Sequence, residues 1–237
     1  MCATLADMPA ATIRARARAE MINEIKAIAR RHLAAEGANL SLRAVAREMG
    51  MVSSAIYRYF PSRDELLTAL IIDGYHALGE AAETGDAEVT DRADLRGRWL
   101  AVCQAVRRWA VAHPAEYALL FGSPVPGYAA PQETTVAAVR TPATLIGILQ
   151  DGFAAGTLVD PGPEELTGPV HADLAAARDQ LFAGLPEALL ARGALGWIHC
   201  FGAVSFELFG QLDGLIEARE EYFDHQMRQM ADLIGLP

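Results

Sequence analysis

Between residues 41 and 63 the chain concentrates side chains that hydrogen-bond to phosphates and to base edges. Arg43, Arg58 and Arg63 carry guanidinium groups, which donate hydrogen bonds in a planar fork. Hydroxyl groups come from a second set of residues: Ser41, Ser53, Ser54, Tyr57 and Tyr59. Both kinds of group serve proteins as contacts to the nucleic-acid backbone. The segment therefore predicts contact with a nucleic acid, provided that its helices present these groups on one face.

Two short helices are expected to carry these side chains. Ser41 can cap the first helix, whose apolar residues recur at helical spacing until Gly50 ends it. The second helix is expected over Val52 to Tyr59 and stops before Pro61. Two short helices joined by a tight glycine turn form a helix-turn-helix, a motif whose second helix enters the major groove of DNA. On spacing alone, a plain helical packing unit is an equally open interpretation.

Apolar residues recur at helical spacing almost throughout the chain, and no segment keeps the period-two alternation of a half-buried strand. The sequence therefore predicts an all-α fold. Next to the motif we expect a helix over Ile13–Glu36 and another that Ser62 caps and that ends at a polar break over Thr84–Arg92. The other expected helices are Leu95–His113, Pro114–Gly122, Glu133–Ala155, His171–Phe182, Pro186–Leu212 and Ile216–Ile234.

Charge is distributed unevenly along the chain. Its 237 residues hold 20 Lys and Arg against 30 Asp and Glu, a formal charge of −10, which alone argues against a nucleic-acid partner. Residues 1–63, however, hold 10 basic and five acidic residues, a balance of +5, which leaves −15 for the remainder. This asymmetry indicates a nucleic-acid-facing N-terminal part joined to an acidic body. In the basic part, Arg14, Arg16 and Arg18 are either a minor-groove arm or a solvated charged stretch.

Cysteine usage and apolar stretches bear on the compartment and the assembly. Cys2, Cys103 and Cys200 have no CxxC spacing and cannot all pair, so we expect neither a disulfide framework nor a metal site, and a reducing cytoplasm fits. Met1–Thr12 has no apolar run like that of a signal peptide, and no uncharged stretch reaches the roughly 18–20 residues of a membrane helix.

Pro186–Leu212 is apolar nearly all round, which predicts a homodimer because one small domain covers such a helix poorly.

Two runs of residues carry a family resemblance. They are LSLRAVAREMG at residues 40–50 and SSAIYRYFPSRDELL at residues 53–67, and the second contains a diagnostic Tyr-x-x-Phe-Pro-Ser-basic-acidic-acidic-Leu-Leu string. Over about residues 13–80 the chain resembles the DNA-binding domain of the TetR (tetracycline-repressor-like) family of transcription regulators. Residues 113–124 and the Trp197-x-His199-x-x-Gly202 pattern resemble the subgroup whose regulatory domain is named for a Trp-His-Gly signature.

The resemblance implies roles for single residues. It places Arg43 where the family reads base edges, and an Arg can donate to both O6 and N7 of guanine. It assigns Tyr57 and Arg63 to phosphates, Arg63 beside a helix N-terminus that also favours an anion. The other DNA-contacting residues that it implies are Ser41, Ser53, Ser54, Ala55, Arg58 and Tyr59. Val52 stands where the family often has a capping Ser or Thr, so another residue, such as Ser53, must cap the recognition helix.

The resemblance also implies a DNA-binding domain over residues 13–62 and a ligand-binding and dimerisation domain over residues 63–237. The expected protein is a repressor that binds a palindromic operator in double-stranded DNA as a homodimer and is released by a small hydrophobic effector, without a cofactor. Eight residues of the larger domain either line an apolar effector pocket or build only core. They are Trp99, Cys103, Tyr117, Phe121, Phe153, Trp197, His199 and Phe206.

Two other classes of function stay open beside a regulator. An enzyme acting on a hydrophobic substrate would need a catalytic motif, and the chain has no GxGxxG, P-loop, GxSxG, HExxH or EF-hand pattern, so we expect no catalysis. Its histidines are also not spaced as metal ligands. A helical small-molecule-binding protein without DNA recognition is the other class, against which the intact Arg43, Tyr57 and Arg63 argue.

Overall fold

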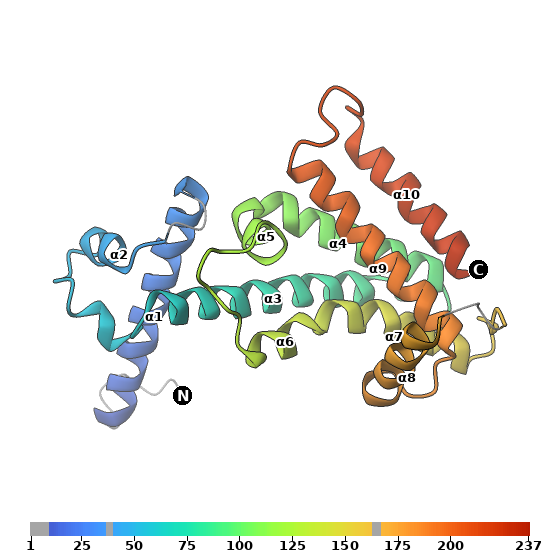
Figure 1. Cartoon of the computed structure of the whole chain (residues 1–237), viewed down its shortest axis with the longest axis horizontal. Helices are drawn as coiled ribbons and strands as arrows, with labels where there is room; N and C mark the ends of the chain where they lie inside the picture. The colour runs from blue at the N-terminus through green and yellow to red at the C-terminus, as the bar shows by residue number, and fades with distance from the viewer. Residues whose placement is uncertain (1–9, 37–39, 163–166) are drawn as a thin grey trace, which may run out of the picture. The chain divides into compact units, whose positions relative to one another are not determined.

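The computed structural model describes residues 10–36, 40–162 and 167–237, and within these ranges the regular elements are helices, with no strand (Figure 1). The predicted all-α fold is confirmed. The described chain divides into two compact units. One holds the described residues up to Ile71 together with Ala115–Pro131, and the other holds Ile72–Pro114 together with Gln132–Pro237.

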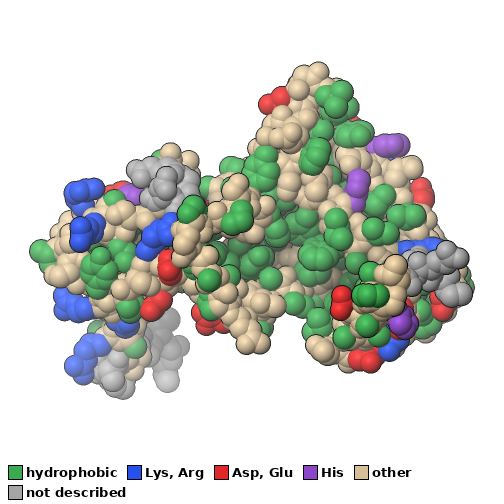
Figure 2. Space-filling model, viewed as in Figure 1, with side chains coloured by type: hydrophobic (Ala, Val, Ile, Leu, Met, Phe, Trp, Pro, Cys, Tyr) green, Lys and Arg blue, Asp and Glu red, His purple; other side chains and the backbone are tan. Residues whose placement is uncertain are grey.

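The first unit is built on a core at which its helices meet. It contains α1 (Ala10–Glu36), α2 (Leu42–Glu48), the 3₁₀ helix η2 (Ile56–Arg58), the first turns of α3 (Arg63–Glu88) and most of α5 (Pro114–Phe121). The buried side chains of this core include Ile25, Ile28, Leu33, Val45, Ile56, Phe60, Leu66 and Leu67. On α1 the buried residues Ile25, Ile28, Ala29 and Leu33 recur at helical spacing, so this helix turns one apolar face inward and leaves its polar face to solvent. In the view of Figure 2, Lys and Arg side chains gather over this unit.

The expected third helix over Val52–Tyr59 is shorter and tighter in the structure. Residues 53–55 form a turn, and only Ile56–Arg58 are helical, with 3₁₀ geometry. The Ala55 amide donates to the Val52 carbonyl at 2.8 Å, and no side chain caps the helix. Val52 has no hydroxyl with which to accept from the first free amides, and Pro61 ends the segment within two turns. The short segment therefore closes with i→i+3 hydrogen bonds.

Helix α3 continues into the expected polar break over Thr84–Arg92 and ends at Glu88, in the middle of that break. Gly85 lies where α4 (Leu95–Ala112) comes close, since a Cβ built on it would meet the Ala101 carbonyl oxygen at 2.8 Å. A glycine that weakens a helix locally is here required by helix packing. Tertiary contact therefore sustains the helix beyond the point that local propensity predicted.

The single helix expected over Glu133–Ala155 is two helices in the structure. α6 (Gln132–Ala138) and α7 (Arg140–Ala154) meet at Val139. Pro142 has no amide hydrogen to donate to Ala138, so it is tolerated only in the first turn of a new helix. The proline therefore decides where α7 begins.

The remaining helices of the second unit are α8 (Gly168–Leu181), α9 (Glu187–Leu208) and α10 (Arg219–Ile234). α9 packs against α4, α7, α8 and α10 and ends four residues before the expected Leu212, and Ile216 precedes α10. Gly210, at φ +75°, reverses the chain after α9. Among the described residues, α9 alone is long and apolar enough to cross a membrane, and 44% of its most apolar stretch is buried inside the protein.

Gly196 allows α9 to approach α4 closely. A Cβ built on it would meet the Trp99 ring at 2.6 Å and Ile234 at 2.9 Å. We expect Gly196→Ala to lower the free energy of unfolding by about 1–3 kcal/mol, because the added methyl group overpacks the core. Gly147→Ala is the control, since a Cβ there meets no atom within 4 Å. Urea denaturation measures both, and equal stability of the two variants would contradict this packing argument.

Candidate functional site

Helix α2 presents a basic face to solvent. Ser41 caps the helix by accepting a hydrogen bond from the Ala44 amide at 3.4 Å, so part of its bonding capacity serves the fold. Leu42, Val45 and Ala46 are buried against the core, which turns Arg43 outward. Arg47 is exposed one turn later on the same face, and sequence reasoning did not select it although its i+4 spacing from Arg43 was visible.

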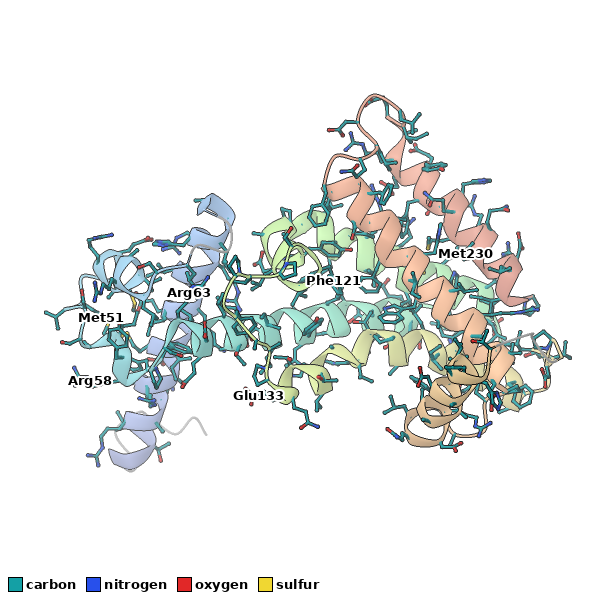
Figure 3. All side chains as sticks on the ribbon, viewed as in Figure 1. Met51, Arg58, Arg63, Phe121, Glu133 and Met230 are labelled. Atoms are coloured by element: carbon teal, nitrogen blue, oxygen red, sulfur yellow. The ribbon has the colours of Figure 1, made fainter. Side chains whose placement is uncertain are left out.

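The recognition segment, residues 52–59, presents Ser53, Ser54, Tyr57 and Arg58 to solvent. Figure 3 shows the labelled Arg58 at the margin of the first unit. Ala55 differs from the expectation, because its side chain is only 6% exposed and belongs to the core. The Ala55 side chain therefore packs on the buried side of the segment, and its methyl group cannot reach a base edge in this conformation.

Two arginines bond to backbone carbonyls of the helix-turn-helix, and one of these carbonyls, that of Arg58, belongs to the recognition segment. Arg18 on α1 donates from Nη1 to the Arg58 carbonyl oxygen at 3.1 Å, and its guanidinium lies 5.3 Å from the centre of the Tyr59 ring. Arg63, expected to bind a phosphate, donates from Nε to the Leu40 carbonyl oxygen at 3.1 Å. Arg18 thus supports the backbone and the Tyr59 ring of the recognition segment. No local pattern could reveal this, since its partner is 40 residues away.

A carboxylate fixes α2 against α1. Glu48 accepts hydrogen bonds from Arg31 Nη2 and from His32 Nε2, each at 2.6 Å. Hydrogen bonds from Arg31 and His32 lower the pKa of the Glu48 carboxyl, which favours its ionised form. The exposed side chains of α2 are therefore carried on a helix anchored at its far end.

The eight residues expected around an effector pocket belong to both compact units and have several different surroundings within them. Tyr117 and Phe121 contact each other within the first unit, with ring centres 4.9 Å apart. Trp99 is buried in the second unit, where its indole donates to the Met227 carbonyl oxygen at 3.2 Å. Cys103 is buried as well, and burial together with a hydrogen bond to Cys200 raises the pKa of its thiol, which keeps it protonated and unreactive.

The other four expected pocket residues belong to different surroundings in the second unit. His199 Nε2 lies 2.9 Å from Gln226 Oε1, so this histidine has the hydrogen-bond partner that its helix position required. Phe153 is half-buried and Phe206 is exposed. Trp197 does line an apolar cavity, between α7, α8 and α9, and its neighbours there are residues that sequence reasoning did not select.

Comparison with known proteins agrees with this geometry. The family described as "Bacterial regulatory proteins, tetR family" matches residues 25–70, and "Tetracyclin repressor-like, C-terminal domain" matches residues 99–230. HTH-type transcriptional regulators Rv1816 of Mycobacterium tuberculosis and Mb1846 of Mycobacterium bovis are each 41% identical over 229 residues, covering 92% of this chain and 94% of theirs.

Solved structures share the fold. The protein SCO4313, described as regulatory, superposes with a TM-score of 0.74 at 34% identity, covering 92% of this chain and 98% of its own. A protein of unknown function from Rhodococcus sp. RHA1 superposes with a TM-score of 0.67 at 24% identity, covering 91% and 94% of the two chains. With both halves of the chain matched and relatives aligned over nearly its whole length, the protein belongs to the TetR family of helix-turn-helix transcriptional regulators.

Proposed function

We propose that the protein is a repressor that binds a palindromic DNA operator as a homodimer and is released from it by a small hydrophobic effector. The observation that carries the proposal is the exposed polar face of the helix-turn-helix, where Arg43, Ser53, Ser54 and Tyr57 remain accessible. The local charge of +5 over residues 1–63 favours approach to phosphates although the whole chain is acidic. Ligand-responsive repression is also the typical mode of this family.

A stripe on α9 supports the homodimer. Leu195, Ile198, Phe206 and Phe209 are exposed and are separated by three, eight and three residues, which places them on one helical face. Gly202 lies between them, and a Cβ there would meet no atom within 4 Å, so a second helix can approach closely. A soluble monomer rarely leaves such a continuous apolar stripe uncovered. A symmetric partner covers it with the same stripe.

Dimerisation is also what operator binding requires. Two recognition segments must lie about 34–36 Å apart to enter successive major grooves on one side of the duplex. An effector that prefers another spacing lowers DNA affinity by its differential binding to the two states. α3 is suited to this control because one continuous helix begins at Arg63, beside the recognition segment, and ends at Glu88 in the second unit.

The assignments that complete the proposal concern domains and chemistry. We assign residues 13–62 to DNA binding and residues 63–237 to effector binding and dimerisation, with a C-terminal domain of the Trp-His-Gly subgroup. The protein acts in the cytoplasm by binding, without catalysis and without a cofactor.

A band-shift assay with the intergenic DNA beside its own gene tests the proposal. Binding should depend on both half-sites and weaken steeply with salt, and binding without either property would overturn it.

Mutation should distinguish residues that read bases from residues that bind the DNA backbone. We expect Arg43→Ala to lower the preference for the operator over a version changed in one half-site base by about tenfold, because one bidentate contact contributes roughly 1–3 kcal/mol of discrimination. We expect Tyr57→Phe to weaken binding to all sequences alike, by about fivefold, because it removes one phosphate hydrogen bond. Competitive binding on both DNAs measures the ratio, and a uniform loss with Arg43→Ala would contradict its assignment.

A further inference from the structure

An apolar cavity of about 220 Å³ lies between α7, α8 and α9. Its wall is entirely apolar, although a few polar side chains are usual in ligand sites. The side chains that shape it are Pro142 and Ile146 on α7, Leu174 and Phe182 at α8, and Leu190 and Trp197 on α9. The cavity is partly open to solvent, since the lining residues Leu181 and Trp197 are exposed, and its volume is somewhat larger than that of a ~150 Å³ engineered apolar cavity that binds benzene. A single-ring molecule with short substituents fits this volume, whereas a helix of a partner protein does not.

We propose that this cavity is the effector site and that it takes a small uncharged hydrocarbon or alkyl-substituted aromatic molecule. The proposal rests on the function proposed above, since it names the class of effector and the place where it binds. A carboxylate or an ammonium group would lose its hydration against this wall without gaining a partner, which costs several kcal/mol. Transfer of apolar surface from water into an apolar site is favourable. The cavity therefore favours an apolar ring and disfavours a charged group placed against its wall.

The first turn of α7 connects the cavity to α3. Val139 and Pro142 line the cavity, and Arg140 lies between them in the chain. Arg140 donates from Nε to Glu83 Oε1 at 2.5 Å and from Nη2 to Glu83 Oε2 at 2.6 Å. Its Nη1 also donates to the His76 carbonyl oxygen at 3.2 Å. Arg140, at the edge of the cavity, therefore bonds to two positions on α3, His76 and Glu83, which are two helical turns apart.

Gly79 on α3 leaves space for the Arg140 side chain. A Cβ built on Gly79 would lie 2.6 Å from Cδ and 2.8 Å from Cγ of Arg140, so the stem of the arginine crosses the helix where no side chain stands. The ion pair is partly exposed and adds little to stability, but its paired hydrogen bonds define a direction as well as a distance. Hydrogen bonding by Arg140 lowers the pKa of Glu83, which keeps the pair ionised at neutral pH. A shift of α7 caused by an occupant therefore reaches α3 through Arg140.

The binding arm of the test compares toluene with benzoate, which differ chiefly by a methyl group and a carboxylate. We expect toluene to raise the thermal midpoint of the intact protein and to change its tryptophan emission saturably, and benzoate to do neither. Ala177→Phe and Ala194→Phe each place a ring in the cavity from a different helix, α8 or α9, so both should abolish the toluene effects while leaving the fold unchanged by circular dichroism. Absence of toluene binding to the wild type, or binding that survives both substitutions, overturns the site.

The coupling arm uses Arg140→Met, which keeps the apolar stem over Gly79 and removes the ion pair. With DNA from beside the gene as probe, toluene should weaken wild-type binding by about tenfold, within the usual range of allosteric coupling. The variant should bind toluene as the wild type does and release DNA less than twofold. Full release by the variant overturns the Arg140 connection. Failure of the wild type to bind DNA would instead defeat the proposed function, while the toluene measurements would still decide the site.

Discussion

Ile198→Glu is expected to yield a monomer that binds operator DNA about 10²- to 10⁴-fold more weakly than the wild type. Ile198 is 60% exposed in the middle of the apolar stripe of α9. In a two-fold symmetric dimer the substitution enters twice, so two carboxylates would be buried near each other without partners. The loss of DNA affinity follows because linked half-sites gain their affinity from effective concentration, which a monomer lacks. Analytical ultracentrifugation and band-shift titration measure the two effects.

Val136→Glu is the matched control for this prediction. Val136 is 78% exposed, but it lies on α6, away from the stripe. The control should stay dimeric and bind DNA normally, because it adds the same charge at a site that the proposed interface does not cover. A dimeric Ile198→Glu variant with normal operator affinity would mean that the subunits pair through another surface.

The second large effect concerns an ion-pair cluster that joins α3, α4 and α7. Arg98 is 3% exposed, and it donates from Nε to Asp86 Oδ1 and from Nη2 to Asp151 Oδ2, each at 2.8 Å. We expect Asp86→Asn to lower the free energy of unfolding by about 3 kcal/mol, because it leaves the buried guanidinium with only the exposed Asp151 carboxylate as a charged partner. Urea denaturation at pH 7 measures this loss.

The same substitution should change how stability depends on pH. Burial of Asp86 raises its pKa, but hydrogen bonds from Arg98 and Arg92 outweigh burial, and the net pKa lies below the ordinary value of 3.8. A carboxyl whose pKa is lower in the folded state contributes stability above its unfolded pKa, and that contribution is lost as the pH falls through the folded pKa. The difference in stability between wild type and Asp86→Asn should therefore be full at pH 5–7 and shrink below about pH 4.

The exposed pair of Arg16 and Glu20 on α1 supplies a control. Glu20→Gln removes the same kind of charge from a solvated ion pair and should cost less than about 0.5 kcal/mol at pH 7. Equal losses for Glu20→Gln and Asp86→Asn would show that burial of Arg98 does not set the energy of its ion pairs. A difference between wild type and Asp86→Asn that stays constant down to pH 3 would contradict the lowered pKa.

Local signals predicted the helices and the DNA-binding motif of this protein. Ser41, Gly50 and Pro61 act through hydrogen bonds or φ angles of their own chain neighbours, so their effects can be predicted from adjacent residues alone. The helix boundaries failed where tertiary contact opposed local preference, as at Gly85, which weakens α3 locally and yet lies inside it against α4. The resemblance added roles for exposed residues such as Arg43 and Tyr57.

Only the tertiary structure decided which of these side chains are free to act. It buried Ala55, and it brought Arg18 to the Arg58 carbonyl from 40 residues away. It also assigned Tyr117 and Trp197 to different compact units, and it built an apolar cavity from three helices whose residues carry no shared motif. Each of these outcomes depends on which helix faces meet, and residue spacing describes one helix at a time. The sequence therefore determined the helices and the chemistry of their exposed faces. The packing of those helices determined the apolar cavity and the contact of Arg18 with the recognition segment.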